Sequence, residues 1–124
     1  MISFRVACLV STILCLVLFG IFLISPTDYA GSYGGAAGPG AEFMGRRAAP
    51  SLLGLALITG LLRGTLDLAV QWAISWGMIV VYLGVALTGI YTFAIGEASQ
   101  TILLAASGEI LLACIFGLSL RRPG

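Results

Sequence analysis

Residues 101–120, TILLAASGEILLACIFGLSL, decide the fold of this chain. The stretch is long enough to cross the hydrocarbon core of a bilayer, which takes ~20 mostly apolar residues in a helix. It contains one charged side chain, Glu109. A charge near the centre of a bilayer costs at least about 2.5 kcal/mol, so an acid at this position indicates a specific role. We therefore expect a transmembrane helix with a polar site at Glu109.

The composition of the whole chain also favours a membrane protein. Its 124 residues are 60% hydrophobic and 9% charged, and the mean hydropathy is +1.11. Soluble domains have about 25% charged residues, so this chain has too few charges to cover a surface that faces water. Its formal net charge of +1 and its short basic runs give no reason to expect nucleic acid as a partner. The expected surroundings are the lipid bilayer.

Three further apolar stretches, residues 4–24, 41–62 and 68–93, are expected to cross the membrane together with residues 100–120. A signal peptide is the alternative interpretation of the first stretch, because a positive charge, Arg5, precedes an apolar run. That run is longer than the apolar region of a typical signal peptide, and no A-x-A cleavage site precedes residue 31. We therefore expect it to remain as a helix.

The order of the stretches predicts the topology. Residues 25–40 are rich in glycine and are expected to form a compact loop on the outer side. The connections after the second and third stretches are short, so neighbouring helices should be antiparallel. We therefore predict a single domain, residues 1–124: an all-α membrane protein folded as an up-down-up-down bundle of four transmembrane helices.

The distribution of arginine predicts the orientation of this bundle. Four transmembrane helices place both termini on the same side of the membrane. The arginines expected on that side are Arg5, Arg63, Arg121 and Arg122, and those on the other side are Arg46 and Arg47. Cytoplasmic segments of membrane proteins carry an excess of arginine and lysine. Both termini are therefore expected in the cytoplasm.

The residue types present argue against several classes of site. The chain contains no histidine and no CxxC pair, so we expect neither a haem or metal site with histidine ligands nor a thiol–disulfide centre. No Ser–His–Asp set is possible either. Cys8, Cys15 and Cys114 all lie in apolar stretches and are interpreted as small buried residues. We expect a protein that is not an enzyme and that uses no cofactor or metal ion.

Glu109 and Tyr82 are predicted to form a polar site inside the bundle. The chain runs in opposite directions through the third and fourth membrane spans, and equal depth then places Glu109 near Tyr82. A hydrogen bond between the two side chains would satisfy both. In one interpretation the carboxyl group, kept neutral by burial, only joins two helices. In the other, Glu109 takes up a proton, a cation or the polar head of a ligand.

Charged side chains are also expected at both membrane surfaces. Adjacent arginines point about 100° apart on a helix, so one of the pair can contact lipid phosphate while the other turns towards an acid. The inner surface should have a charge cluster of Arg63 and Asp67, interpreted as a device for topology and packing. The candidate ion-pair or anion site on the outer surface consists of Glu42, Arg46, Arg47 and Glu97.

Two segments, FMGRRAAPSLLGLAL at 43–57 and GIYTFAIGEASQTILLAASGEILLACIFGL at 89–118, carry a family resemblance. The chain resembles small bacterial four-helix inner-membrane proteins of unknown function. The resemblance implies a four-helix architecture and a location in the bacterial inner (cytoplasmic) membrane. It implies no activity. The matching positions are Arg46, Arg47, Gly96, Glu97 and Glu109.

Two classes of function remain open at this point. The first is an accessory or structural subunit of a membrane complex, or a self-associating helix bundle. Glycines spaced for close helix contact favour it: Gly60 with Gly64, and Gly77 with Gly84. The alternative is a small proton-coupled carrier, or a lipid- or quinone-binding protein, that uses Glu109. Small multidrug carriers have an acid in their first helix, which this chain lacks. Trp72 and Trp76, with Tyr82, could line a quinone groove.

Overall fold

The computed structural model describes residues 3–32, 34 and 39–120, without the side chains of Thr27, Ala30, Pro39 and Glu42. Helices make up most of these residues, and the prediction of an all-α protein is confirmed. Arg121 and Arg122 lie outside the described residues. The helices are α1 (Phe4–Ile24), α2 (Pro26–Ser32), α3 (Pro39–Leu62), α4 (Leu68–Ala94) and α5 (Thr101–Ser119).

Three of the helices in the described ranges, α1, α4 and α5, are long and apolar enough to cross a membrane. The fourth long helix, α3, has 24 residues, which is a sufficient length. Its first half, however, contains Glu42, Arg46 and Arg47, which lower its apolar character. Three helices of the described chain therefore suit a membrane protein by length and composition, and the crossing of the membrane by α3 stays a prediction.

The helix ends follow from local chemistry. The Ser3 hydroxyl accepts a hydrogen bond from the Val6 amide and caps the start of α1. Asp67 caps α4 in the same way, with its carboxylate 2.9 Å from the Ala69 amide nitrogen. α1 ends before Pro26, which has no N–H to continue the helix. These ends agree with the predicted membrane spans to within two residues.

The predicted loop at residues 25–40 is wrong in its first half, because Pro26–Ser32 forms α2. Two physical reasons account for this helix. The fixed φ of Pro26 suits the first position of a helix. The ring of Tyr29 also packs against that of Phe22, with the centroids 4.8 Å apart. Residues 35–38 of the loop lie outside the described part of the chain.

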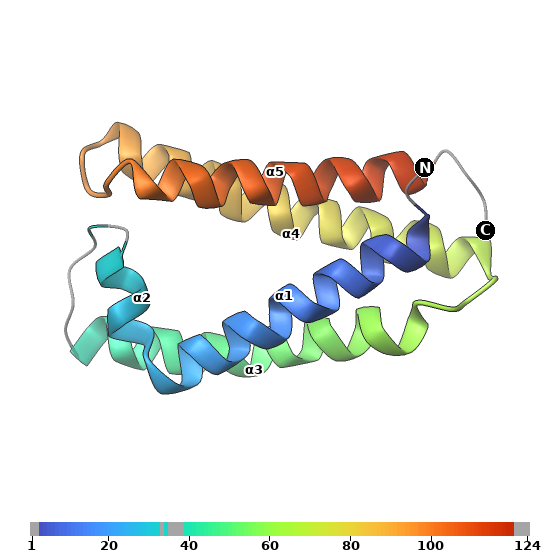
Figure 1. Ribbon diagram of the computed structural model, residues 1–124, viewed down its shortest axis with the longest axis horizontal. Coiled ribbons are helices and arrows are strands. Elements are labelled where there is room, and N and C mark those ends of the chain that lie inside the picture. Colours follow the sequence, from blue (N-terminus) through green and yellow to red (C-terminus); the bar gives the residue numbers. More distant parts are fainter. Residues whose placement is uncertain (1–2, 33, 35–38, 121–124) are drawn as a thin grey trace.

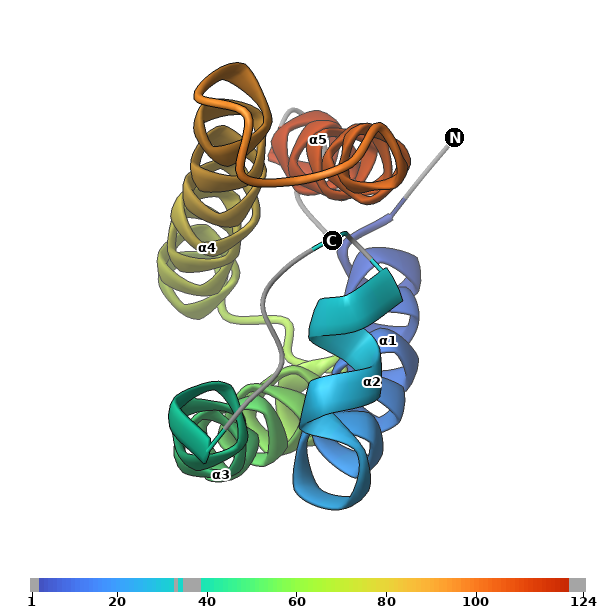
Figure 2. The same cartoon turned by 90° about the vertical axis from the view of Figure 1, so that its left-hand side faces the viewer.

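The long helices form two antiparallel pairs (Figures 1 and 2). α1 packs along α3, and α4 packs along α5. The contact between the pairs comes mainly from α1 and α5. Figure 1 shows that these two helices approach each other at the end where the chain begins, and that the pairs diverge towards the end where α2 lies. α2 itself packs on α3 and α1.

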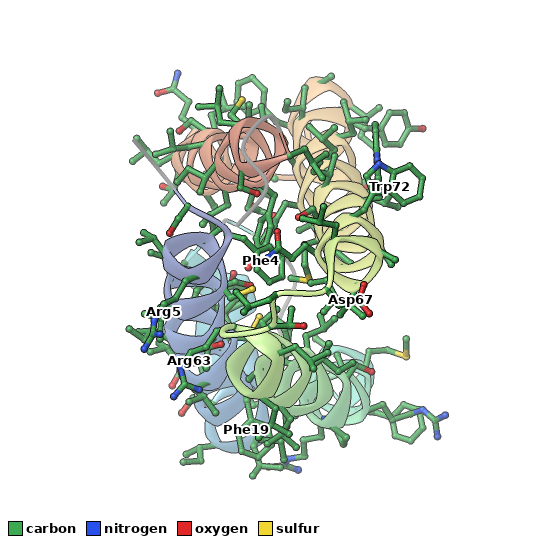
Figure 3. The ribbon with its side chains drawn as sticks, turned by 90° about the vertical axis from the view of Figure 1, so that its right-hand side faces the viewer. Phe4, Arg5, Phe19, Arg63, Asp67 and Trp72 are labelled. Carbon is green, nitrogen blue, oxygen red and sulfur yellow. The ribbon has the colours of Figure 1, made fainter. Side chains whose placement is uncertain are left out.

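A hydrophobic cluster joins the two pairs near the end where the chain begins. In it the rings of Tyr82 and Phe116 are stacked, with centroids 6.4 Å apart and an interplanar angle of 22°. Phe4 lies between the helices at this end, as Figure 3 shows. Small residues allow the helices to approach closely. The cluster consists of Phe4, Ala7, Cys8, Met78, Tyr82, Leu112, Ala113 and Phe116.

A substitution at Gly45 tests the packing of α2 on α3. A Cβ atom at Gly45 would overlap the ring of Pro26, whereas one at Gly54 meets no described atom within 4 Å. We expect Gly45→Ala to lower the free energy of unfolding by about 1–3 kcal/mol, the usual cost of overpacking. Gly54→Ala should leave it unchanged or raise it by up to about 1 kcal/mol through helix propensity. Unfolding in mixed micelles, followed by circular dichroism, measures both; equal stabilities would contradict this packing.

Candidate functional site

A cavity of about 430 Å³ lies between the two helix pairs, and all five helices contribute to its walls. Its volume falls in the range of ligand sites in proteins, about 300–1,000 Å³. The walls are mostly aliphatic. Their polar groups are the side chains of Cys15, Tyr29, Tyr82 and Glu109. An apolar cavity with a few polar groups is the usual form of a site for a small molecule.

Glu109 is the one formally charged residue in the cavity wall. Its side chain is half-buried on α5. Within residues 3–32, 34 and 39–120, no hydrogen bond or ion pair joins Glu109 to another side chain or to the backbone. A carboxyl group withdrawn from bulk water is costly without a polar partner. The described residues thus show no polar contact from Glu109 to another helix, which is what a residue that only joins two helices would need.

Tyr82 lines the same cavity as Glu109, as equal depth in the two spans predicts. The expected hydrogen bond between them is replaced by another. The Tyr82 hydroxyl shares a hydrogen bond of 2.6 Å with the Ser11 hydroxyl, and the Cys15 sulfur lies 3.9 Å away. Tyr82 is 5% exposed and Ser11 is fully buried. The physical reason is that the long Tyr82 side chain reaches across to α1, where the Ser11 hydroxyl needs a partner.

The inner charge cluster does not form as an ion pair. An Nη atom of Arg63 donates a hydrogen bond to the Gly60 carbonyl, and Asp67 accepts from backbone amides as the cap of α4. Figure 3 shows Arg63 beside Arg5, with Asp67 on the side of Trp72. Each of the two charged groups thus forms a hydrogen bond with backbone groups at a helix end, and the predicted pairing of Arg63 with Asp67 is absent from the described structure.

The residues of the predicted outer site come from two separate segments, α3 and the connection between α4 and α5. Arg46 and Arg47 lie on α3 and are exposed, and Glu97 lies exposed in the connection between α4 and α5. Arg46 Nε donates to the Leu23 carbonyl at 3.4 Å, and the Arg47 guanidinium lies 5.7 Å from the centre of the Phe43 ring. The side chain of Glu42 lies outside the described part of the structure.

No protein-family model, curated protein or solved structure matches this chain. The resemblance to small bacterial inner-membrane proteins therefore stays a prediction. Within the described residues, no three His, Cys, Asp or Glu side chains are grouped as metal ligands would be. The cavity and Glu109 are accordingly the features on which a functional argument can be built.

The hydrogen bond between Ser11 and Tyr82 can be measured by a double-mutant cycle. It joins α1 of one pair to α4 of the other. Hydrogen bonds between membrane helices contribute about 0.6–1.7 kcal/mol. We expect Tyr82→Phe and Ser11→Ala each to lower the free energy of unfolding by about 1 kcal/mol, with little further loss in the double variant. Tyr91→Phe, at an exposed position on α4, is the control. Additive effects in unfolding experiments would contradict this coupling.

Proposed function

We propose that this protein is a multi-pass membrane protein that binds a lipophilic cation in the cavity between its helix pairs, with Glu109 as the counter-charge. The observation that carries the proposal is a half-buried carboxyl group that faces the cavity and has no partner among the described residues. In this proposal α1, α3, α4 and α5 all cross the membrane in an up-down-up-down arrangement. The protein is not an enzyme.

The chemistry of the walls supports a positively charged ligand. None of the described arginines lines the cavity, so that part of the chain places no cation beside an ionised Glu109. Three aromatic side chains, Phe22, Tyr29 and Tyr82, also contribute to the walls. The faces of aromatic rings attract organic cations. The aliphatic remainder of the walls suits the apolar part of such a ligand.

Glu109 also provides a means of coupling this ligand to protons. The carboxyl group can hold either a proton or the charge of a bound cation, so the two compete. Such competition at a single membrane-embedded acid is the basis of proton-coupled transport. A quinone is the other lipophilic ligand to consider, and it would use the neutral carboxyl group as a hydrogen-bond donor.

The distribution of charge in the sequence supports an orientation of the helices. We propose that both termini lie in the cytoplasm, because the side that carries them has the larger number of arginines. The proposed location, the inner membrane of a bacterium, rests on the resemblance to small bacterial membrane proteins.

Binding of tetraphenylphosphonium to the protein in lipid nanodiscs tests the proposal. We expect the wild type to bind this cation more weakly as the pH is lowered, since protons compete for Glu109. Glu109→Gln should raise the Kd by at least about tenfold, because it removes the counter-charge. Glu97→Gln, which removes an exposed acid outside the cavity, is the matched control. Equal affinity of wild type and Glu109→Gln would overturn the proposal, and selective binding of a quinone instead would replace it.

A second candidate function is assembly, either with copies of the chain or as an accessory subunit of a larger membrane complex. One observation favours it. Gly77 and Gly84 are exposed on α4, and a Cβ atom at either would meet no described atom within 4 Å. They are seven residues apart and share a face of the helix. A helix of another subunit could approach closely there.

Substitution of these glycines by bulky residues tests whether the protein assembles through this face. We expect Gly77→Leu and Gly84→Leu to shift the protein towards monomers in liposomes, as counted by single-molecule photobleaching, since leucine blocks a close approach. Gly20→Leu on α1 is the control, because a Cβ there also meets no described atom within 4 Å. A wild type that is monomeric, and that emerges alone in native mass spectrometry of its own membrane, would rule out both forms of assembly.

A further inference from the structure

Arg5 and Arg63 form a pair of positive charges at one end of the molecule, away from the central cavity. Arg5 lies in the first turn of α1, and Arg63 follows the last residue of α3. Both side chains are exposed, and both line the same pocket of about 150 Å³. Figure 3 shows them side by side. Two arginines from different helices therefore face one small site.

No acid neutralises this pair within the described residues. Neither arginine forms an ion pair there, and Asp67, the acid nearest to Arg63 in the sequence, caps α4. Arg63 donates one hydrogen bond to the Gly60 carbonyl. A guanidinium has five N–H donors, so both arginines keep several for a ligand. Arginine pairs of this kind suit a phosphate group, which they can bind through two parallel hydrogen bonds.

An apolar groove continues from Arg63 along the outer side of the α1–α3 pair. It has a volume of about 230 Å³ and is lined by Thr12, Leu16, Ala56, Leu57, Gly60 and Leu61 in addition to Arg63. Leu57 and Leu61 are 52% and 77% exposed, so the groove opens to the surroundings of the helices. In a membrane these surroundings are acyl chains.

Gly60 and Thr12 account for the groove and for its apolar character. Gly60 lies against Thr12, and a Cβ atom there would come within 3.3 Å of the Thr12 methyl carbon. The Thr12 hydroxyl is already satisfied, since it lies 2.8 Å from both the Cys8 carbonyl and the Thr59 hydroxyl. The hydrogen bond from Arg63 to the Gly60 carbonyl holds the guanidinium at the head of the groove.

We propose that an anionic phospholipid binds this surface, with its phosphate at Arg5 and Arg63 and one acyl chain in the α1–α3 groove. A membrane lipid fits both parts of the site at once, because a charged head and an apolar chain adjoin each other at the membrane boundary. Basic pockets between helices on the cytoplasmic side are a recurring form of lipid site. A free phosphate ion would use the arginines alone. The site is independent of the cavity at Glu109.

Native mass spectrometry of the protein released from nanodiscs, with phosphatidylglycerol and phosphatidylcholine in equal amounts, tests the proposal. We expect the wild type to retain one phosphatidylglycerol in preference to phosphatidylcholine. Arg5→Gln with Arg63→Gln should reduce this preference by about 30-fold. Arg46→Gln with Arg47→Gln removes the same charge from exposed positions outside this site, and it should reduce the preference much less than the first double variant does, because any lipid phosphate at Arg46 or Arg47 is a separate contact. If the first double variant does not fold, as judged by circular dichroism, the two single variants should each lose about fivefold.

Two results would overturn the proposal. One is the same lipid preference in the wild type and in the Arg5 and Arg63 variants. The other is displacement of phosphatidylglycerol by inorganic phosphate or by a dihexanoyl lipid at the concentration of the long-chain lipid, since this would show that the groove adds no affinity. Displacement only by a long-chain anionic lipid supports the proposal.

Discussion

The rest of the structure depends on the way its two helix pairs are joined. Lipid chains are as apolar as leucine, so helices in a bilayer associate through close packing and polar contacts instead of the hydrophobic effect. Here the cluster around Phe4 and Phe116 supplies the packing, and the buried hydroxyl pair of Ser11 and Tyr82 supplies the polar contact. Both lie on the contact of α1 with α4 and α5. Because the pairs diverge beyond it, a cavity forms in which Glu109 can face a ligand.

The features of this fold that were predictable from sequence are those set by single helices. The length of the apolar runs predicts the positions of α1, α4 and α5, and the opposite chain directions predict that Tyr82 and Glu109 lie near each other, as their shared cavity shows. What depends on packing between helices was not predictable. Glycine content favoured a loop where Pro26–Ser32 is helical. The partner of Tyr82 was missed, although a serine within an apolar span, as at Ser11, is a signal that a polar contact between helices exists.

α1 contributes residues to both proposed sites. Leu14 and Cys15 line the central cavity, and Thr12 and Leu16 line the lipid groove. The electrostatic character of the sites is opposite as well. Among the described residues, Glu109 faces the cavity with no hydrogen bond or ion pair, whereas Arg5 and Arg63 line their pocket with no acid beside them. In the two proposals, this separation of charge gives a chain with a formal net charge of +1 distinct sites for a cation and for an anion.

Tyr82 belongs both to the cluster that joins the helix pairs and to the wall of the cavity. A molecule that touches walls from both pairs can bind only while the pairs are joined. The bound molecule then stabilises the association of the two pairs by about 2.7 kcal/mol when its free concentration is one hundred times its Kd. By this thermodynamic linkage, the persistence of the folded bundle becomes a measure of which small molecules are dissolved in the membrane around it.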